Sequence, residues 1–419
     1  MLISEKLRKL GALAEKELAG IFGKIDEVSL INTERVLDVF REERVSESMF
    51  APSTGYGYGD FGRDAIDRIA AKVLGGESGF MRPSILCGTH AITVGLFGLL
   101  RPGDTLLSVT GSPYDTLREV IGLEGDSGNG SLADFNIKYK EVELVDGDVD
   151  MAGIKAAIEE CRDTLKVVFI QRSKGYMNRK TLSSEEIGKI ASNSKKWAGK
   201  DIFVVVDNCY GEFTETCEPV SCGADLIIGS LIKNPGGGMA DIGGYLVGSE
   251  RAVELAGYRL CCPGVGLEAG ASLGQNRNML RGLFYAPHTV AQALKTAHFA
   301  AYVFDALGYT VSPGAFEVRH DIIQTVQLGS AEALVGFCAG IQSASPVDSH
   351  VIPEAWDMPG YNDPVVMAAG AFVGGASIEL SADGPVRPPY TAFLQGGLTF
   401  ESGKLGILAA AGKCLETRK

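Results

Sequence analysis

Apolar residues near the start of the chain recur at helical spacing. One stripe consists of Leu7, Leu10, Leu13, Ala14 and Leu18. A second apolar cluster lies at positions 36–40. Residues three and four apart share one face of a helix, so this spacing predicts a helical arm over residues 1–48.

Through the middle of the chain, short apolar runs alternate with helical segments. After the glycine-rich stretch STGYGYGDFG, a helix is predicted at Arg63–Leu74. Strands are predicted at Ser84–Leu86, Leu106–Val109, Val167–Ile170, Phe203–Val206, Leu226–Gly229 and Gly244–Val247, with helices such as Ala91–Leu100 and Ser184–Ser192 between them. Such alternation is typical of an α/β fold with a mostly parallel sheet covered by helices on both faces. We assign residues 49–285 to this large domain.

The pattern changes from about Ala286, where a long predicted helix, Val290–Leu307, begins the last part of the chain. It is followed by predicted strands at Ile322–Val326, Val365–Ala369 and Ala376–Leu380 and a helix at Ala331–Gln342. These elements predict a smaller α+β C-terminal domain over residues 286–419.

Composition and charge exclude several classes of protein. No apolar run approaches the roughly 20 residues that span a bilayer, so we expect no membrane association. The net charge is −13, from 52 acidic and 39 basic residues, which argues against a nucleic acid partner. The nine irregularly spaced cysteines are typical of reduced thiols in the cytoplasm, and the five histidines show no metal-ligand spacing, so we expect no metal site.

Two segments, VVVDN and GSLIKNPGGG, carry the most informative chemistry. Asp207 ends one apolar strand, and Lys233 follows the next strand and precedes three glycines. Open α/β sheets bind ligands at the carboxyl ends of their strands. A lysine that forms a Schiff base and a carboxylate that pairs with a protonated pyridine nitrogen are the groups that pyridoxal 5′-phosphate (PLP) requires.

A third segment, CGTHAITVGLFGLLRPGD, supplies a site for the cofactor phosphate. Gly88 and Thr89 begin an apolar helix, where free backbone N–H groups favour an anion, although Thr89 also fits an ordinary helix cap. Ser230 would add a hydroxyl, and Tyr114, after another strand, would stack on the pyridine ring or be a plain loop tyrosine. Lys174 also follows an apolar strand and competes with Lys233, but it lacks the glycine-rich flank.

These segments resemble the PLP-dependent enzymes of Cys/Met metabolism, and most closely the methionine γ-lyase-like family often called aluminium resistance proteins. The resemblance also covers GYGYGDFGRD, VVVDNCYGEF, YAPHTVAQALK and GAFVGGASIELSADGPVRPPY. It implies the aspartate aminotransferase fold (fold type I), with Lys233 as Schiff-base lysine and Asp207 as pyridinium partner. It also implies Gly88, Thr89 and Ser230 around the phosphate and Tyr114 over the ring.

The resemblance further implies a homo-oligomer, a dimer or tetramer, in which a tyrosine and an arginine of the neighbouring subunit reach the phosphate. Tyr56, Tyr58 and Arg63 are the candidates here, in a segment whose spacing departs from the family's. An arginine of the small domain is expected to bind the substrate carboxylate. Arg387 is the candidate for that role and Arg319 the reserve; each also fits an ordinary salt bridge.

The expected activity is β- or γ-elimination on a small, sulfur-containing amino acid, which makes the chain a carbon–sulfur lyase. Residue spacing points to PLP, and the reaction type rests on the resemblance. Two alternatives remain: a PLP-dependent aminotransferase, and a PLP-binding protein of regulation or cofactor homeostasis that turns over no amino acid.

Overall fold

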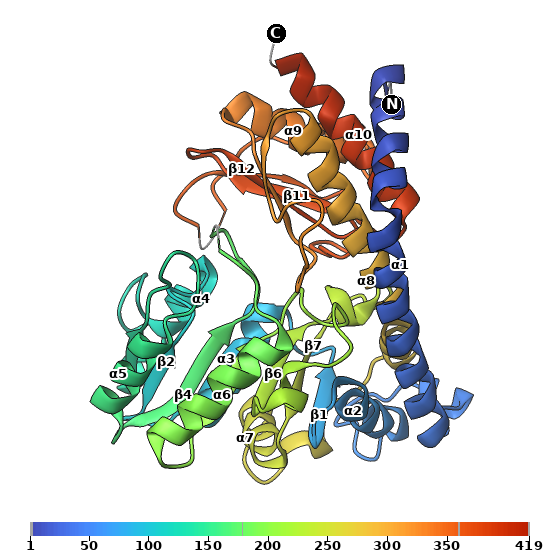
Figure 1. Ribbon diagram of the computed structural model, residues 1–419. Coiled ribbons are helices and arrows are strands. Elements are labelled where there is room, and N and C mark those ends of the chain that lie inside the picture. The colour runs from blue at the N-terminus through green and yellow to red at the C-terminus, as the bar shows by residue number, and fades with distance from the viewer. Residues whose placement is uncertain (1–2, 178, 359–360, 418–419) are drawn as a thin grey trace.

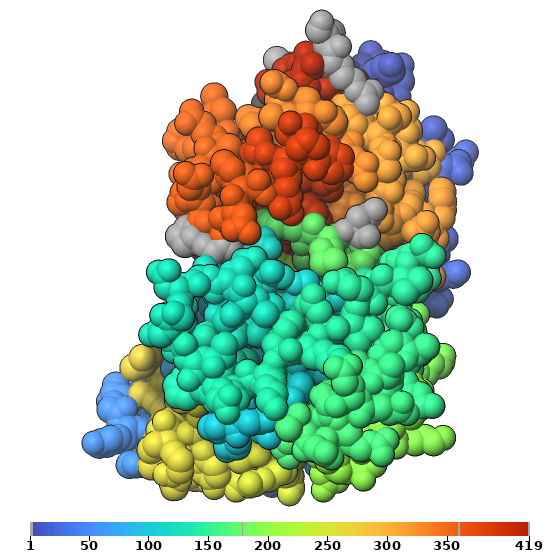
Figure 2. Space-filling model, turned by 90° about the vertical axis from the view of Figure 1, so that its left-hand side faces the viewer, coloured from blue at the N-terminus to red at the C-terminus, as the bar shows by residue number. Residues whose placement is uncertain are grey.

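The computed structural model describes residues 3–177, 179–358 and 361–417, which fold into a large and a small lobe joined by two long helices (Figure 1). Helix α1 (Glu5–Glu42) is the predicted helical arm, and helix α8 (Asn276–Ala306) packs beside it. Figure 2 shows the C-terminal lobe stacked on the large lobe. No helix in the described ranges is both long and apolar enough to cross a membrane.

The large lobe is built on a seven-stranded sheet in the order β1-β7-β6-β5-β4-β2-β3. Strands β2 to β6 are parallel; β7 is antiparallel to β6, and the edge strand β1 is in turn antiparallel to β7. The strands are β1 (Ser78–Arg82), β2 (Thr105–Ser108), β3 (Lys138–Glu141), β4 (Leu165–Gln171), β5 (Phe203–Asp207), β6 (Leu226–Ser230) and β7 (Gly244–Gly248).

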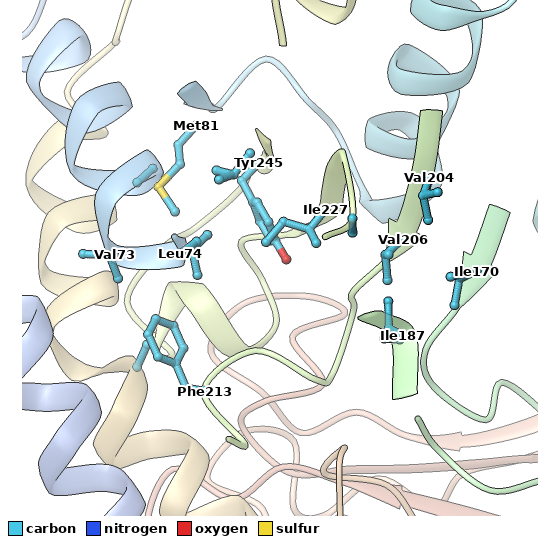
Figure 3. Close-up of a cluster of buried hydrophobic side chains, with 14 of the residues drawn as sticks. Val73, Leu74, Met81, Ile170, Ile187, Val204, Val206, Phe213, Ile227 and Tyr245 are labelled. Atoms are coloured by element: carbon cyan, nitrogen blue, oxygen red, sulfur yellow. The ribbon is translucent and has the colours of Figure 1, made fainter. Parts of the chain in front are cut away.

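Helices cover both faces of this sheet, which explains the uninterrupted apolar runs of its central strands. Val204 and Val206 of β5 pack into one core cluster, whereas Val205 between them packs into the cluster on the opposite face. Figure 3 shows the first cluster, where Val206 lies near Ile187. The helices on that face are α2 (Phe61–Leu74), α5 (Met151–Cys161) and α6 (Ser184–Ala198); those on the other are α3 (Gly88–Leu99), α4 (Asp115–Ile121) and α7 (Glu250–Leu260).

The small lobe is a five-stranded antiparallel sheet, β10-β11-β12-β9-β8, with two helices on one face. Its elements are β8 (Thr310–Ser312), β9 (Gln324–Gln327), α9 (Ala331–Ser343), β10 (Val365–Ala368), β11 (Ser381–Pro385), β12 (Thr391–Gln395) and α10 (Phe400–Thr417). Ala382 of β11 packs under the helices, so its neighbours Ser381 and Asp383 point to the opposite face.

Helices α1 and α8 each contact the cores of both lobes. In α1, Leu7 and Leu18 belong to the small-lobe core, whereas Val36 and Val39 belong to the large-lobe core. Helix α8 is continuous through position 286, where we placed the domain boundary. The division at that residue stays a prediction, and the two helices hold the lobes together across it.

Two predicted strands are wrong. Ser84–Leu86 forms a turn, and the strand lies earlier at β1, because Pro83 lacks the N–H group needed to continue the ladder. Ala376–Leu380 is a series of turns in which Glu379 N–H donates to the Ala376 carbonyl, and β11 begins only at Ser381. Gly375, with φ +81°, bends the chain just before this segment.

Candidate active site

A cavity of about 560 Å³ lies at the carboxyl ends of the parallel strands, between the two lobes. Eight residues singled out in the sequence line it together: Gly88, Thr89, Tyr114, Lys174, Asp207, Ser230, Lys233 and Arg387. They come from separate segments of both lobes, so the fold brings the predicted chemistry into one place.

Lys233 and Asp207 enter this cavity from neighbouring strands. Asp207 is the last residue of β5, and Lys233 follows the end of β6 by three residues. The turn after Lys233 packs tightly against α8: Gly237 has φ +54°, and a Cβ there would collide with the Gly282 carbonyl. The glycines after the lysine therefore allow the close approach that fixes the turn.

The electrostatics of this pair suit a cationic ring between them. Burial raises the pKa of the Asp207 carboxyl, while the Lys233 amine and the N–H of Cys209, 3.1 Å from Asp207 Oδ1, lower it. Burial alone would lower the pKa of Lys233, but Cys209, Tyr210 and Asp207 raise it above its ordinary value. A buried carboxylate gains most from a positive partner, which is what a protonated pyridine nitrogen provides.

The start of helix α3 forms the end of the cavity that suits a phosphate. Gly88 is the first residue of the helix, and a Cβ there would lie 3.4 Å from Cys209 Sγ and 3.7 Å from Lys233 Nζ. The first N–H groups of a helix have no acceptor within it and bind anions. The hydroxyls of Thr89 and Ser230 line the same end, so amides, hydroxyls and an amine converge there.

Tyr114 is fixed by hydrogen bonds at both its backbone and its side chain. Its N–H donates to Gln171 Oε1 at 3.0 Å, and its hydroxyl lies 3.0 Å from Thr89 Oγ1. Burial raises the pKa of Tyr114 well above its ordinary value, so the phenol keeps its proton at neutral pH. It is held beside the helix terminus where the phosphate is expected.

Lys174 and the two arginine candidates lie in different surroundings. Lys174 also lines the cavity, but its Nζ donates to Ser312 Oγ at 3.1 Å, and burial lowers its pKa to about 8. Arg387 lines the cavity with its side chain 49% exposed and pairs with Asp363 at 2.8 Å. Arg319 is buried among carbonyl groups and Gln324 and does not itself line the cavity, so the geometry favours Arg387.

The three candidates for reaching a neighbouring subunit do not line this cavity. Tyr56 and Tyr58 are 76% and 62% exposed, and their rings stack with centroids 5.5 Å apart. Arg63 is buried in its own chain, where Nη1 donates to the Gly57 and Gly270 carbonyls. Its guanidinium therefore holds the loop that carries the two tyrosines.

Sequence reasoning missed several lining residues. Tyr210, within the quoted run VVVDNCYGEF, has φ +72° and lies against Lys233. The others include Tyr176, Tyr361, Ser381 and Asp383. Side chains of a strand point alternately to its two faces, so a strand predicted at β11 would have placed Ser381 and Asp383 on the same face. The strand predicted from the sequence is instead Ala376–Leu380, which leaves both residues out. No group of three or more histidine, cysteine or acidic side chains in the described ranges could hold a metal ion.

A family model described as "Methionine gamma-lyase" matches residues 7–415 of this chain. The chain belongs to the methionine γ-lyase family. It is 50% identical over 413 residues to the uncharacterized protein YnbB of Bacillus subtilis, covering 98% of this chain and 97% of YnbB. These matches confirm the family recognised from the motifs.

Solved structures confirm the fold. A protein from Clostridium acetobutylicum, described as a candidate cystathionine β-lyase involved in aluminium resistance, superposes with a TM-score of 0.95 at 47% identity. The match covers 98% of this chain and 96% of that one. The PLP-dependent protein YhfS of Escherichia coli shares the fold at a TM-score of 0.63 and 14% identity, covering 94% and 97% of the two chains.

The predicted cofactor is confirmed as well: this family uses PLP, and the chain is a PLP-dependent enzyme of fold type I. The residues in the cavity fit that group. The open position at Gly88, the helix terminus and the hydroxyls suit its phosphate, and the buried Asp207 suits its ring nitrogen. Lys233, between these two ends, has the amine that would bind it covalently.

Proposed function

We propose that this enzyme cleaves the carbon–sulfur bond of a small amino acid by β- or γ-elimination and releases a 2-oxo acid, ammonia and a thiol. The observation that carries the proposal is the arrangement of Lys233, Asp207 and the α3 terminus in one cavity. The family match supports the reaction type.

When bound, PLP supplies an electron-withdrawing ring that stabilises negative charge at the Cα of an amino acid. With the cofactor and substrate bound, Lys233 Nζ would be the base that takes the Cα proton. Its place between Gly88 and Asp207 keeps it within the cavity during this transfer. In its neutral form this amine would carry the lone pair that a general base requires.

Tyr114 is the group that returns a proton to the departing sulfur. Because burial raises its pKa, the phenol is protonated at neutral pH and can donate. Thr89 Oγ1, 3.0 Å from its oxygen, orients it. Arg387 binds the substrate α-carboxylate at the cavity mouth and gives up its contact with Asp363 to do so.

The test is a substrate screen with the PLP-loaded protein, with methionine, cystathionine and S-alkylcysteines as probes. Equal amounts of 2-oxo acid, ammonia and thiol, formed without added 2-oxo acid, would support elimination. Turnover that requires a 2-oxo acid acceptor would replace the lyase with an aminotransferase. Bound PLP without any turnover would favour a role in regulation or cofactor homeostasis.

Lys233→Ala and Lys174→Ala form a matched pair for the lysine assignment. Borohydride should abolish the visible absorbance band of the wild-type protein and leave the reduced cofactor on Lys233, as mapped by peptide mass spectrometry. We expect Lys174→Ala to keep this band and Lys233→Ala to lose both the band and the turnover. Labelling at Lys174 would overturn the assignment.

We also propose that the enzyme is a homo-oligomer. Tyr56, Tyr58, Phe61 and Leu273 are all more than half exposed, and the Leu273 N–H donates to the Ser53 carbonyl, which joins the two loops. An apolar surface of this kind is typical of a subunit interface. Tyr58→Glu should shift the mass measured by light scattering toward the monomer, whereas a wild-type monomer would contradict the proposal.

A further inference from the structure

The small-lobe wall of the cavity is polar, and two of its oxygen atoms lack a partner. Ser381 and Asp383 are two residues apart on β11, so their side chains share the face opposite the small-lobe core. Both residues are 8% exposed, and both line the cavity. Asp383 Oδ1 and Ser381 Oγ are buried without a hydrogen-bond partner among the described residues.

The neighbours of Asp383 leave this carboxylate only partly satisfied. Gln395 Nε2 on β12 donates to Asp383 Oδ2 at 3.4 Å, a long contact, and the Tyr176 hydroxyl also acts on this carboxylate as a hydrogen-bond donor, which leaves Oδ1 without a partner among the described residues. Asp383 faces Met367 across the strand pair with β10. Leaving a buried acceptor unpaired costs free energy, so a folded protein normally supplies a partner. Here the open cavity is the space in which a ligand can supply it.

Asp383 is charged at neutral pH, although burial raises its pKa to about 6. The titratable groups that face it are Tyr176, Tyr210, Tyr361 and Lys233, and Cys338 interacts with it electrostatically from the small-lobe core beneath the strand. The positive charge that acts on it comes from Lys233, whose nitrogen is committed to the cofactor in the loaded enzyme. A carboxylate and a hydroxyl with free acceptor positions therefore face the cavity, and the cation that acts on the carboxylate is the one that the cofactor would occupy.

We propose that Ser381 and Asp383 form a substrate subsite for a second protonated amine, carried on the side chain of a thioether amino acid. This inference rests on the proposed function, because it names the substrate class of the same cavity. An ammonium group has three donors and a positive charge, which match one carboxylate oxygen and one hydroxyl oxygen. An uncharged S-alkyl side chain would leave both oxygens unpaired.

The test uses two substrates that differ by one amine, L-cystathionine and S-(3-carboxypropyl)-L-cysteine. The wild-type holoenzyme should prefer cystathionine about 10-fold or more in kcat/KM. Asp383→Asn should remove this preference by raising the KM for cystathionine, with little effect on the other substrate. Equal losses for both substrates would overturn the subsite, because they would place the carboxylate near the common α-amine.

A second variant and a binding measurement keep the subsite testable on its own. Ser381→Ala removes one acceptor and should lower the preference several-fold, whether or not Asp383→Asn folds. Titration of the cofactor absorbance band gives the Kd of each ligand without turnover. If neither is cleaved but cystathionine still binds more tightly, and Asp383→Asn removes the difference, the lyase fails and the subsite stands. Equal Kd values for the wild-type protein would overturn the subsite.

Discussion

The Nζ atom of Lys233 lies 4.1 Å from the centroid of the Tyr210 ring. Tyr210 follows β5 and holds φ +72°, a backbone conformation that costs free energy for a residue other than glycine. Ser377 Oγ of the small lobe donates to its hydroxyl at 3.4 Å. This one side chain therefore contacts the cofactor lysine and ties the two lobes together over the cavity.

The ring of Tyr210, more than its hydroxyl, should matter for activity. Its face stabilises the Lys233 amine through a cation–π contact, which is worth up to about 2 kcal/mol when desolvated. Tyr210→Ala should lower kcat/KM about 10-fold or more, whereas Tyr210→Phe, which keeps the ring, should stay within about threefold. Steady-state kinetics of the holoenzymes distinguish the two. Equal losses in both variants would assign the effect to the contact with Ser377.

Asp207 should control cofactor binding as well as turnover. Removing one member of a buried ion pair costs about 3–5 kcal/mol, so Asp207→Asn should weaken PLP binding and lower kcat about 100-fold or more. Equilibrium dialysis against PLP and single-turnover kinetics measure the two effects. Asp38→Asn, at an exposed pair on α1, is the control and should change neither. Unchanged PLP affinity in Asp207→Asn would remove Asp207 from the ring nitrogen.

The part of the site that the sequence predicted follows from local signals. Val204, Val205 and Val206 are buried on both faces of the sheet, so β5 reads as an apolar run and places Asp207 at its end. Gly88 and Lys233 lie within short motifs whose spacing fixes their geometry. These positions can therefore be predicted without knowing how segments distant in the sequence pack together.

The small-lobe wall could not be predicted in this way. Ser381 and Asp383 face the cavity only because Ala382 packs under the small-lobe helices, and that register depends on the pairing of β11 with β10 and β12. The turns at 376–380 are apolar enough to resemble a strand, so the predicted strand ends at Leu380, directly before the residue at which β11 begins. Tyr210 depends on a positive φ that its neighbours impose and the sequence pattern does not reveal.

Arg387 should act on substrate binding rather than on the chemical step. A guanidinium that forms two parallel hydrogen bonds to a carboxylate cannot be replaced by an amine without loss. Arg387→Ala should raise KM about 10- to 100-fold with kcat within about threefold, and Arg387→Lys should restore only part of the loss. Asp363→Asn releases the arginine from its ion pair at 2.8 Å and should leave KM equal or lower. An unchanged KM in Arg387→Ala would assign carboxylate binding to another residue.

Glu212 makes the stability of the enzyme depend on pH between about 4.5 and about 8. The side chain is fully buried; Tyr245 donates to Oε1 at 2.7 Å, and Oε2 has no partner among the described residues. Burial raises the pKa of Glu212 to about 8, so the folded protein keeps a proton that the unfolded chain releases near its ordinary value of 4.5. This proton linkage contributes stability that is fully present below that ordinary value.

The free energy that the Glu212 proton contributes to stability is lost as the pH rises, by about 1.4 kcal/mol per pH unit at most. The loss stops once the pH passes the pKa of Glu212 in the folded protein. Glu212→Gln mimics the protonated form and does not titrate. Its melting temperature should match the wild type near pH 5, exceed it increasingly up to about pH 8, and keep a constant lead beyond. Thermal melting of both proteins with PLP present between pH 5 and 9 measures this. Glu185→Gln, at the exposed pair with Lys189, is the control. If the difference in melting temperature between Glu212→Gln and the wild type did not grow with pH, Glu212 would be ionised throughout.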